Sequence, residues 1–257
     1  MRKSKRPPAP VGASSAAQTD NPRTLCIDIG GTGIKTLVVG TNGKPLTGKK
    51  RVDTPRPATP RAVIKAILAL AKEHGVFDRI SVGFPGVVRR GVVETAHNLH
   101  PDWVGVNIDR MLTKELGKSV RAANDADVQG LGAVKGEGVE LVITLGTGFG
   151  SALFVDGRLV PNIQLGHHAG WNEKTYEEQL GIKAFKKAGR KKWSRRVLKA
   201  VASLSALFNF DRLYIGGGNA QKISVELPPR VLIVSNEEGL LGGLALWNGK
   251  ENSYGVR

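Results

Sequence analysis

The sequence predicts an α/β protein built from two similar lobes. Patterns typical of strands alternate with patterns typical of helices along most of the 257 residues. Each half of the chain also contains a strand, a Gly-Thr-Gly turn and a second strand, first over residues 24–39 and again over residues 141–155. Such a repeat is typical of two related halves that hold a nucleotide or a phosphate chain between them.

Residues 1–22 are rich in Pro, Ala, Ser and basic residues and lack hydrophobic periodicity, so we expect a disordered basic tail. Residues 23–123 are expected to form the first lobe and residues 124–257 the second. The last helix is expected either to stay with the second lobe or to return to the first.

The first lobe is expected to begin with a hairpin, because two apolar runs flank a glycine turn. Helical spacing of apolar residues and a glycine after the last turn predict a helix that ends before Gly75. The expected elements are the hairpin Thr24–Val39, strands near Lys49–Asp53, at Arg79–Phe84, Val87–Val88, Val92–Val93 and Val120–Ala122, and helices Pro60–His74 and Asn107–Leu116.

The second lobe is expected to repeat this order, with a strand, a glycine turn and two further strands after its first helix. The expected elements are helices Asp125–Lys135, Thr175–Leu180, Arg196–Phe208 and Leu240–Trp247, strands Leu141–Gly146, Ala152–Val155, Arg158–Val160, Leu213–Ile215 and Val231–Val234, and the turn Thr147–Ser151.

Composition limits the class of protein. No apolar run approaches the roughly 20 residues that cross a bilayer, and no apolar segment follows the basic N-terminus as it would in a signal peptide. A single cysteine, Cys26, excludes an internal disulfide and a cysteine zinc cluster. We therefore expect a cytoplasmic protein with no membrane contact.

The net charge of +16 is unusual, and a surface of this sign attracts polyanions. The first 23 residues carry only four of these charges, whereas nine basic residues and no acidic residue lie between Lys183 and Lys199. This run predicts either a solvated helix face or a contact with an anion. With 5% aromatic residues and no nucleic-acid-binding motif, no specific binding of nucleic acid is expected.

The glycine turn after Asp28 predicts a phosphate site, because Gly30, Gly31 and Gly33 allow backbone amides to turn towards an anion. Asp28 ends the first strand and is placed to hold a metal-bound water. The turn lacks the Walker pattern and is followed by a strand, so it is not a dinucleotide-binding fingerprint either. The alternative is a plain hairpin turn.

The stretch from Asn124 to Asp127 lies between two such turns, at the expected junction of the lobes. Phosphoryl transfer needs amides around the phosphate, a metal ion and a base beside the attacking hydroxyl. Asp125 is our candidate for the base, and Mg²⁺, which keeps several waters, is the expected ion.

Four segments together resemble one family: Asp28–Lys35, Asn124–Asp127, Leu145–Ser151 and Ile215–Asn219. They are similar to the ROK sugar kinases, and within these to the polyphosphate glucokinase branch, over about residues 24–250. The resemblance implies the actin-like ATPase (ribonuclease H-like) fold, in which two lobes, each with a mixed sheet flanked by helices, enclose the sugar. It also implies a homodimer.

The implied activity is phosphoryl transfer from inorganic polyphosphate, ATP or both to the 6-hydroxyl of glucose or mannose, with Mg²⁺. Asp125 matches the base, and the sugar ligands match Asn98, Asn124, Gln164, His167 and Glu177, with Glu178 as the alternative to the last. The phosphate ligands match Asp28, Gly30, Gly31, Thr32, Gly33, Lys35, Gly146, Thr147, Gly148, Gly216, Gly217 and Gly218.

Two departures from the family pattern matter. Gln164 stands where the family usually has Glu, and an amide loses the charge while gaining the ability to donate. The cysteine zinc motif of the wider family is absent, as expected for the polyphosphate branch. The change at Gln164 leaves open a sugar-binding protein with weak or lost catalysis. The preferred donor and hexose stay undecided at this point.

Overall fold

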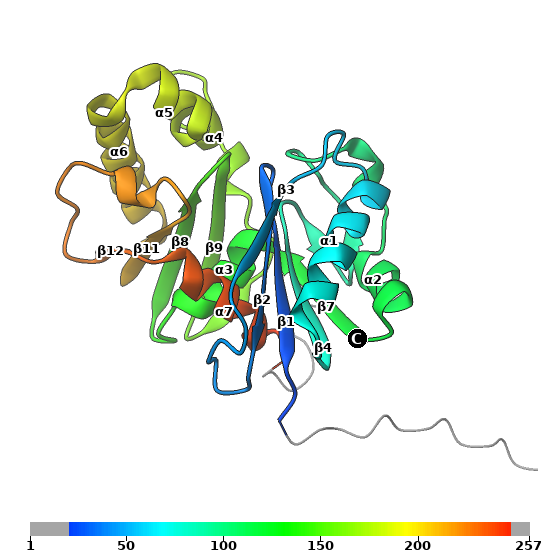
Figure 1. Cartoon of the computed structure of the whole chain (residues 1–257). Coiled ribbons are helices and arrows are strands. Elements are labelled where there is room, and N and C mark those ends of the chain that lie inside the picture. The colour runs from blue at the N-terminus through cyan, green and yellow to red at the C-terminus, as the bar shows by residue number, and fades with distance from the viewer. Residues whose placement is uncertain (1–20, 248–257) are drawn as a thin grey trace, which may run out of the picture.

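The computed structural model describes residues 21–247, so nearly all of the expected basic tail lies outside the described residues. Two five-stranded mixed sheets lie side by side (Figure 1). The first has the order β3-β2-β1-β4-β7 and the second β10-β9-β8-β11-β12. In both, the three strands at one edge pair antiparallel and the others pair parallel. The internal repeat therefore covers five strands in each lobe, which confirms the predicted fold class.

The strands of the first sheet are β1 (Thr24–Ile29), β2 (Gly33–Val39), β3 (Lys50–Asp53), β4 (Arg79–Phe84) and β7 (Ser119–Asn124). Those of the second are β8 (Val139–Leu145), β9 (Phe149–Val155), β10 (Arg158–Val160), β11 (Arg212–Gly216) and β12 (Val231–Ile233). A small separate hairpin consists of β5 (Val88–Arg89) and β6 (Val92–Val93).

The helices are α1 (Pro60–His74), α2 (Ile108–Leu116), α3 (Asp125–Ala133), α4 (Tyr176–Leu180), α5 (Ile182–Ala188), α6 (Arg190–Phe208) and α7 (Asn236–Ala245), with 3-10 turns η1 (Pro101–Trp103), η2 (Leu165–His167) and η3 (Ala220–Lys222). None of the helices in the described part of the chain has the length and hydropathy that a bilayer crossing requires.

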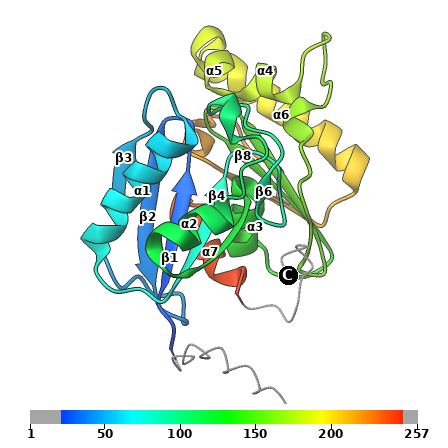
Figure 2. The same ribbon diagram turned by 90° about the vertical axis from the view of Figure 1, so that its right-hand side faces the viewer.

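Local signals account for the helix ends. Thr59 caps α1 by accepting a hydrogen bond from the amide of Ala62, and Pro60 occupies a first-turn position where its missing N–H costs nothing. Asn107 caps α2 in the same way. The predicted bounds of α1 are confirmed. α1 and α2 pack on the first sheet (Figure 2), where they close the core of that lobe.

Some predicted bounds are wrong. α6 begins at Arg190, six residues before the predicted start, because Trp193 and Val197 continue its buried face through the basic run. The glycine turn after β8 ends at Gly148, since Phe149 already belongs to β9. α7 begins at Asn236 and ends at Ala245, where helix Leu240–Trp247 was predicted.

Helices α3 and α7 cross each other and contact the strands of the first sheet (Figure 1). At their crossing, a Cβ added to Gly242 would overlap the carbonyl oxygen of Val128, so only glycine allows this approach. Ser81 Oγ in β4 donates to the carbonyl of Gly243 at 2.5 Å and accepts from Trp247 Nε1 at 2.8 Å. These contacts fix the C-terminal helix against the first sheet.

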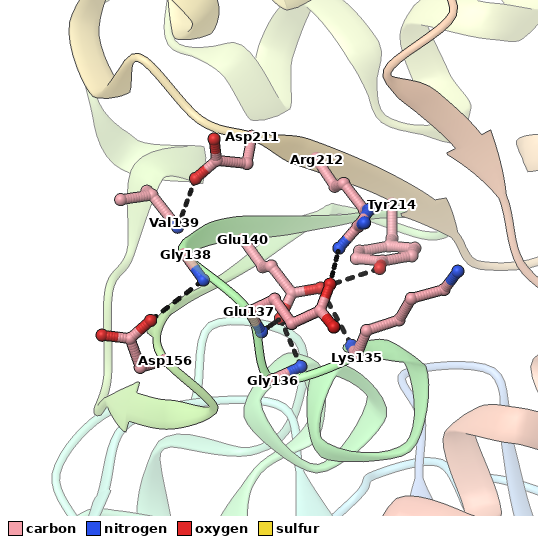
Figure 3. A network of polar contacts seen from close by, with 10 residues as sticks. All are labelled: Lys135, Gly136, Glu137, Gly138, Val139, Glu140, Asp156, Asp211, Arg212 and Tyr214. Atoms are coloured by element: carbon pink, nitrogen blue, oxygen red, sulfur yellow. Dashed lines mark hydrogen bonds and ion pairs between the residues drawn. The ribbon is translucent and has the colours of Figure 1, made fainter.

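The loop between α3 and β8 is organised by one buried carboxylate (Figure 3). Glu140 accepts hydrogen bonds from the backbone amides of Lys135, Gly136 and Glu137 at 2.7–3.2 Å and from Tyr214 Oη at 2.8 Å. Burial favours a raised pKa of Glu140, but these hydrogen bonds to the charged form prevail and lower it. The carboxylate thus ties the end of α3 to the second sheet.

Candidate functional site

A cavity of about 530 Å³ lies between the two lobes and is lined by residues from both. It brings together groups that are far apart in the sequence: both glycine turns, the loop before η1, the start of α3, and the segment from η2 to α4. The predicted site residues that line it are Asp28, Gly30, Gly31, Thr32, Gly33, Lys35, Asn98, Asn124, Asp125, Gly146, Thr147, Gly148, Gln164, His167, Glu177, Gly217 and Gly218.

Gly216 is the exception and is not among the lining residues. It is the last residue of β11 and is buried, and a Cβ added there would lie 2.6 Å from Gln129 Nε2. The neighbouring Gly217 has a φ of 87° and starts the turn that reaches the cavity. We correct the predicted loop accordingly: Gly216 makes room for a side chain of α3, and the lining begins one residue later.

Asn124 holds the start of α3 in place. Its side-chain oxygen accepts hydrogen bonds from the amides of Ala126 and Asp127 at 2.9 and 3.2 Å, and its Nδ2 donates to the carbonyl of Gly86 at 3.0 Å. An amide nitrogen has two N–H groups, so one remains for a ligand. The helix cap therefore fixes Asp125 as the first residue of α3, at the cavity wall.

Asp125 is half-buried, and its Oδ1 accepts from the amide of Ala126 at 2.8 Å. Its pKa is raised from 3.8 to about 7, first by burial and then by the negative charge of Asp28, against the opposing hydrogen bond from Ala126. A carboxyl group with a pKa near neutrality changes its protonation state under physiological conditions. Such a group can accept a proton from a bound hydroxyl.

Asp28 and Lys35 form an ion pair across β1 and β2, with Lys35 Nζ 2.8 Å from Asp28 Oδ2. Both line the cavity. Among the described residues, no group of three or more His, Cys, Asp and Glu side chains is arranged to hold a metal ion. Mg²⁺ commonly needs only one or two carboxylates beside water and substrate phosphates, so Asp28 fits such an ion.

The two glycine turns approach each other beside Asn98. A Cβ added to Gly31 would lie 3.3 Å from Asn98 Cβ and 3.7 Å from Thr147 Cγ2. A Cβ added to Gly148 would overlap Glu177 Oε2. A side chain at either glycine would therefore crowd the cavity, whereas glycine leaves the backbone open to a ligand.

The cavity distinguishes the two glutamates left open by the sequence. Glu177 lines it and accepts a hydrogen bond from the amide of Phe149 at 3.2 Å. Glu178 is exposed and forms a capping box with Thr175 at the start of α4. Glu177 is therefore the better placed of the two to contact a ligand. Tyr176, directly before Glu177, is buried, and its hydroxyl donates a hydrogen bond to Ser203 Oγ.

Sequence reasoning did not select several lining residues. The rings of His97 and His167 lie 4.2 Å apart at the cavity wall. Lys186 of α5 and Asn219 also line it, and Asn219 Nδ2 donates to the carbonyl of Gly146 at 3.0 Å. His97 belongs to the polar loop around Asn98, of the kind that binds ligands, although it was not chosen as a site residue. Lys186 is one of many lysines in a basic run and has no signal of its own.

The chain is similar to known proteins in both sequence and structure. The ROK family model matches residues 24–170. The polyphosphate glucokinase of Mycobacterium tuberculosis is 35% identical over 211 residues, which cover 79% of this chain and 80% of that protein.

Two solved structures are also similar. The inorganic polyphosphate/ATP-glucomannokinase of Arthrobacter sp. strain KM has a TM-score of 0.81 and 34% identity, covering 88% of this chain and 99% of the other. A ROK family glucokinase from Streptomyces griseus, in complex with glucose and AMPPNP, has a TM-score of 0.74 and 22% identity, covering 88% and 100%.

Proposed function

The chain belongs to the ROK family, and from that premise we propose that it is a hexose kinase of the actin-like ATPase fold. It transfers a phosphoryl group from inorganic polyphosphate or ATP to the 6-hydroxyl of glucose. The observation that carries this proposal is the position of Asp125, a carboxyl group with a pKa of about 7 in an interlobe cavity between two glycine turns.

Asp125 is the general base in this proposal. It accepts the proton of the 6-hydroxyl while the hydroxyl oxygen bonds to the terminal phosphorus of the donor. The bond from that phosphorus to the bridging oxygen breaks, and the shortened polyphosphate or ADP leaves with the electron pair. The proton then passes from Asp125 to solvent. Asn124 contributes by fixing the first turn of α3 and, through its remaining N–H, by binding the sugar.

The remaining lining residues divide into a sugar side and a phosphate side. Asn98, Gln164, His167 and Glu177 hold the sugar hydroxyls, and the turns at 30–33 and 146–148 hold phosphate oxygens through backbone amides. Lys35 adds a positive charge, and Gly217 and Gly218 border the donor. Mg²⁺, held by Asp28 through water, would neutralise charge on the donor phosphates when bound.

Polyphosphate and ATP are both part of the proposal, because the similar proteins include a polyphosphate glucokinase and a polyphosphate/ATP-glucomannokinase. The second name also makes mannose a candidate acceptor beside glucose. The net charge of +16 favours polyphosphate as the better donor. A homodimer in the cytoplasm, expected from the family likeness and the single cysteine, completes the proposal.

An activity matrix of both donors against glucose, mannose and other hexoses tests the assignment, with Asp125→Ala as the inactive reference. A kinase loses nearly all turnover in this variant while it still folds and binds sugar. The alternative, a sugar-binding protein without catalysis, is favoured by Gln164 in the cavity. It predicts that the unaltered protein binds glucose but forms no hexose phosphate with either donor.

A further inference from the structure

A strongly basic surface extends from the cavity along α5 and α6. We name the exposed residues Lys183, Lys187, Lys191, Lys192, Arg195 and Lys199 the basic track. None of them forms an ion pair within the described part of the chain. No acidic residue occurs on either helix. Like charges without ion-pair partners on two neighbouring helices repel each other, so an anion bound there would relieve the repulsion.

The track is continuous with the cavity. Lys186 of α5 lines it. Lys222 Nζ donates to Asn219 Oδ1 at 2.8 Å, and Asn219 also lines the cavity. The Lys222 ammonium lies 4.8 Å from the ring centroid of Phe185 in α5. Arg190 Nε at the start of α6 donates to the carbonyl of Lys222 at 2.8 Å. Four positively charged or polar groups thus border the route from the cavity to the track.

From these contacts we propose that the basic track holds the distal phosphates of a long polyphosphate whose terminal phosphate lies in the cavity; this inference rests on the proposed function. From Arg190 to Lys199 the helix axis covers roughly 14 Å, so the track accommodates a stretch of chain beyond the reacting end. In Figure 1, α4, α5 and α6 lie on the second lobe, on the side away from α1 and α2. ATP has no further phosphates to place there.

Nucleic acid is a less suitable occupant. Proteins that hold single strands without sequence preference combine basic grooves with exposed aromatic rings on which bases stack. Of the aromatic residues on these two helices, Trp193 is fully buried, Phe185 lies half-buried beneath Lys222, and Phe208 is half-buried at the far end of α6. The two helices therefore offer charge without an exposed aromatic ring, and the ring of Trp171, which lies off them, is already covered by the ammonium of Lys199 at 4.8 Å. This combination fits a flexible inorganic polyanion better than a strand of stacked bases.

The experiment compares the triple variant Lys187→Gln, Lys191→Gln, Arg195→Gln with a matched control. The control, Arg61→Gln, Lys65→Gln, Lys72→Gln, removes three exposed charges from α1 in the other lobe. For each protein, KM is measured with long-chain polyphosphate, tripolyphosphate and ATP. We expect the KM for long-chain polyphosphate to rise about tenfold or more in the track variant only. We also expect its salt dependence to flatten by roughly one unit of slope per lost contact.

Three outcomes overturn the inference, and they are distinguishable. If the two triple variants show the same KM for long-chain polyphosphate, the track does not bind the donor, while the proposed kinase function stands. If the track variant loses affinity for single-stranded RNA in direct binding but keeps its polyphosphate KM, the track is a nucleic-acid surface. If the unaltered protein uses only ATP, the polyphosphate part of the proposed function fails as well. Circular dichroism checks the fold, and Lys187→Gln alone replaces a triple variant that does not fold.

Discussion

Replacing Asp125 by asparagine is the most direct test of the site. The new amide side chain would keep an oxygen for the backbone N–H of Ala126, which now donates to Asp125 Oδ1 at 2.8 Å, so the start of α3 is preserved. That side chain cannot accept a proton at any accessible pH. A positioned general base contributes roughly 10²–10⁴ in rate, and we expect kcat to fall by about that factor with little change in the KM for glucose.

The pH profile of the unaltered protein gives a second measure of the same group. With a pKa of about 7, roughly half of the Asp125 side chains are ionised at pH 7 and about one in a hundred at pH 5. We expect kcat/KM to fall about tenfold per pH unit below this pKa. Because the charge of Asp28 raises the pKa of Asp125, Asp28→Asn should move the acidic limb to lower pH, whatever else it does to the rate.

Initial rates of glucose 6-phosphate formation, with saturating donor from pH 5 to pH 9, measure both effects. If the fall in rate at acidic pH is the same with ATP and with polyphosphate, the titrating group is in the protein and not in the donor. If Asp125→Asn keeps more than a tenth of the turnover, or if the unaltered protein shows no acidic limb down to pH 5, Asp125 is not the base.

Three further predictions concern other carboxylates and the cavity. Glu140→Gln should lower the free energy of unfolding by about 2–3 kcal/mol at pH 7. Because the pKa of Glu140 is lowered in the folded protein, this difference between the variant and the unaltered protein should shrink as the pH falls through that pKa. A difference in denaturant unfolding that stays constant with pH would contradict this reasoning. Glu177→Gln should raise the KM for glucose about tenfold or more, whereas Glu178→Gln should leave it unchanged. If both variants change the KM equally, Glu177 is not the glutamate that contacts the sugar. Gln164→Glu should lower the KM for glucose severalfold through a charged acceptor, and an unchanged or higher KM would show that Gln164 is not a sugar ligand.

The regular elements could be predicted from the sequence because their signals are local. The bounds of α1 follow from Thr59, Pro60 and Gly75, whose chemistry marks the ends of a helix. The start of α6 could not be found in this way, because the basic residues around Trp193 hide a buried face that the helix shares with the rest of the second lobe. The hydrophobic signal there has too few residues to stand out from the charge.

The site shows the same division. The glycine turns and Asp125 are recognisable because each lies in a short motif, and the structure brings them to one cavity. The lobe packing decides that the rings of His97 and His167 lie close together and that Lys186 lines the cavity. No local sequence pattern encodes this packing. For the same reason, the sequence favoured Glu177 over Glu178 only by resemblance, since the choice depends on which face of α4 meets the glycine turn.

The pKa of Asp125 shows how the fold sets the chemistry. A carboxylate in the first turn of a helix is normally stabilised by about 0.3–1 kcal/mol, which is less than one pKa unit. At Asp125 this influence and the hydrogen bond from Ala126 are outweighed by burial and by Asp28, because the net shift is upwards. The raised pKa lowers the stability of the fold. Between about pH 4 and pH 7, Asp125 is mostly ionised in the unfolded chain and mostly protonated in the folded protein, so the free energy of unfolding falls as the pH rises through this range. Asp125→Asn should therefore melt at a higher temperature than the unaltered protein at pH 8 and at a similar one at pH 4. A variant that is both inactive and more stable would show that this destabilising carboxylate is retained for its function.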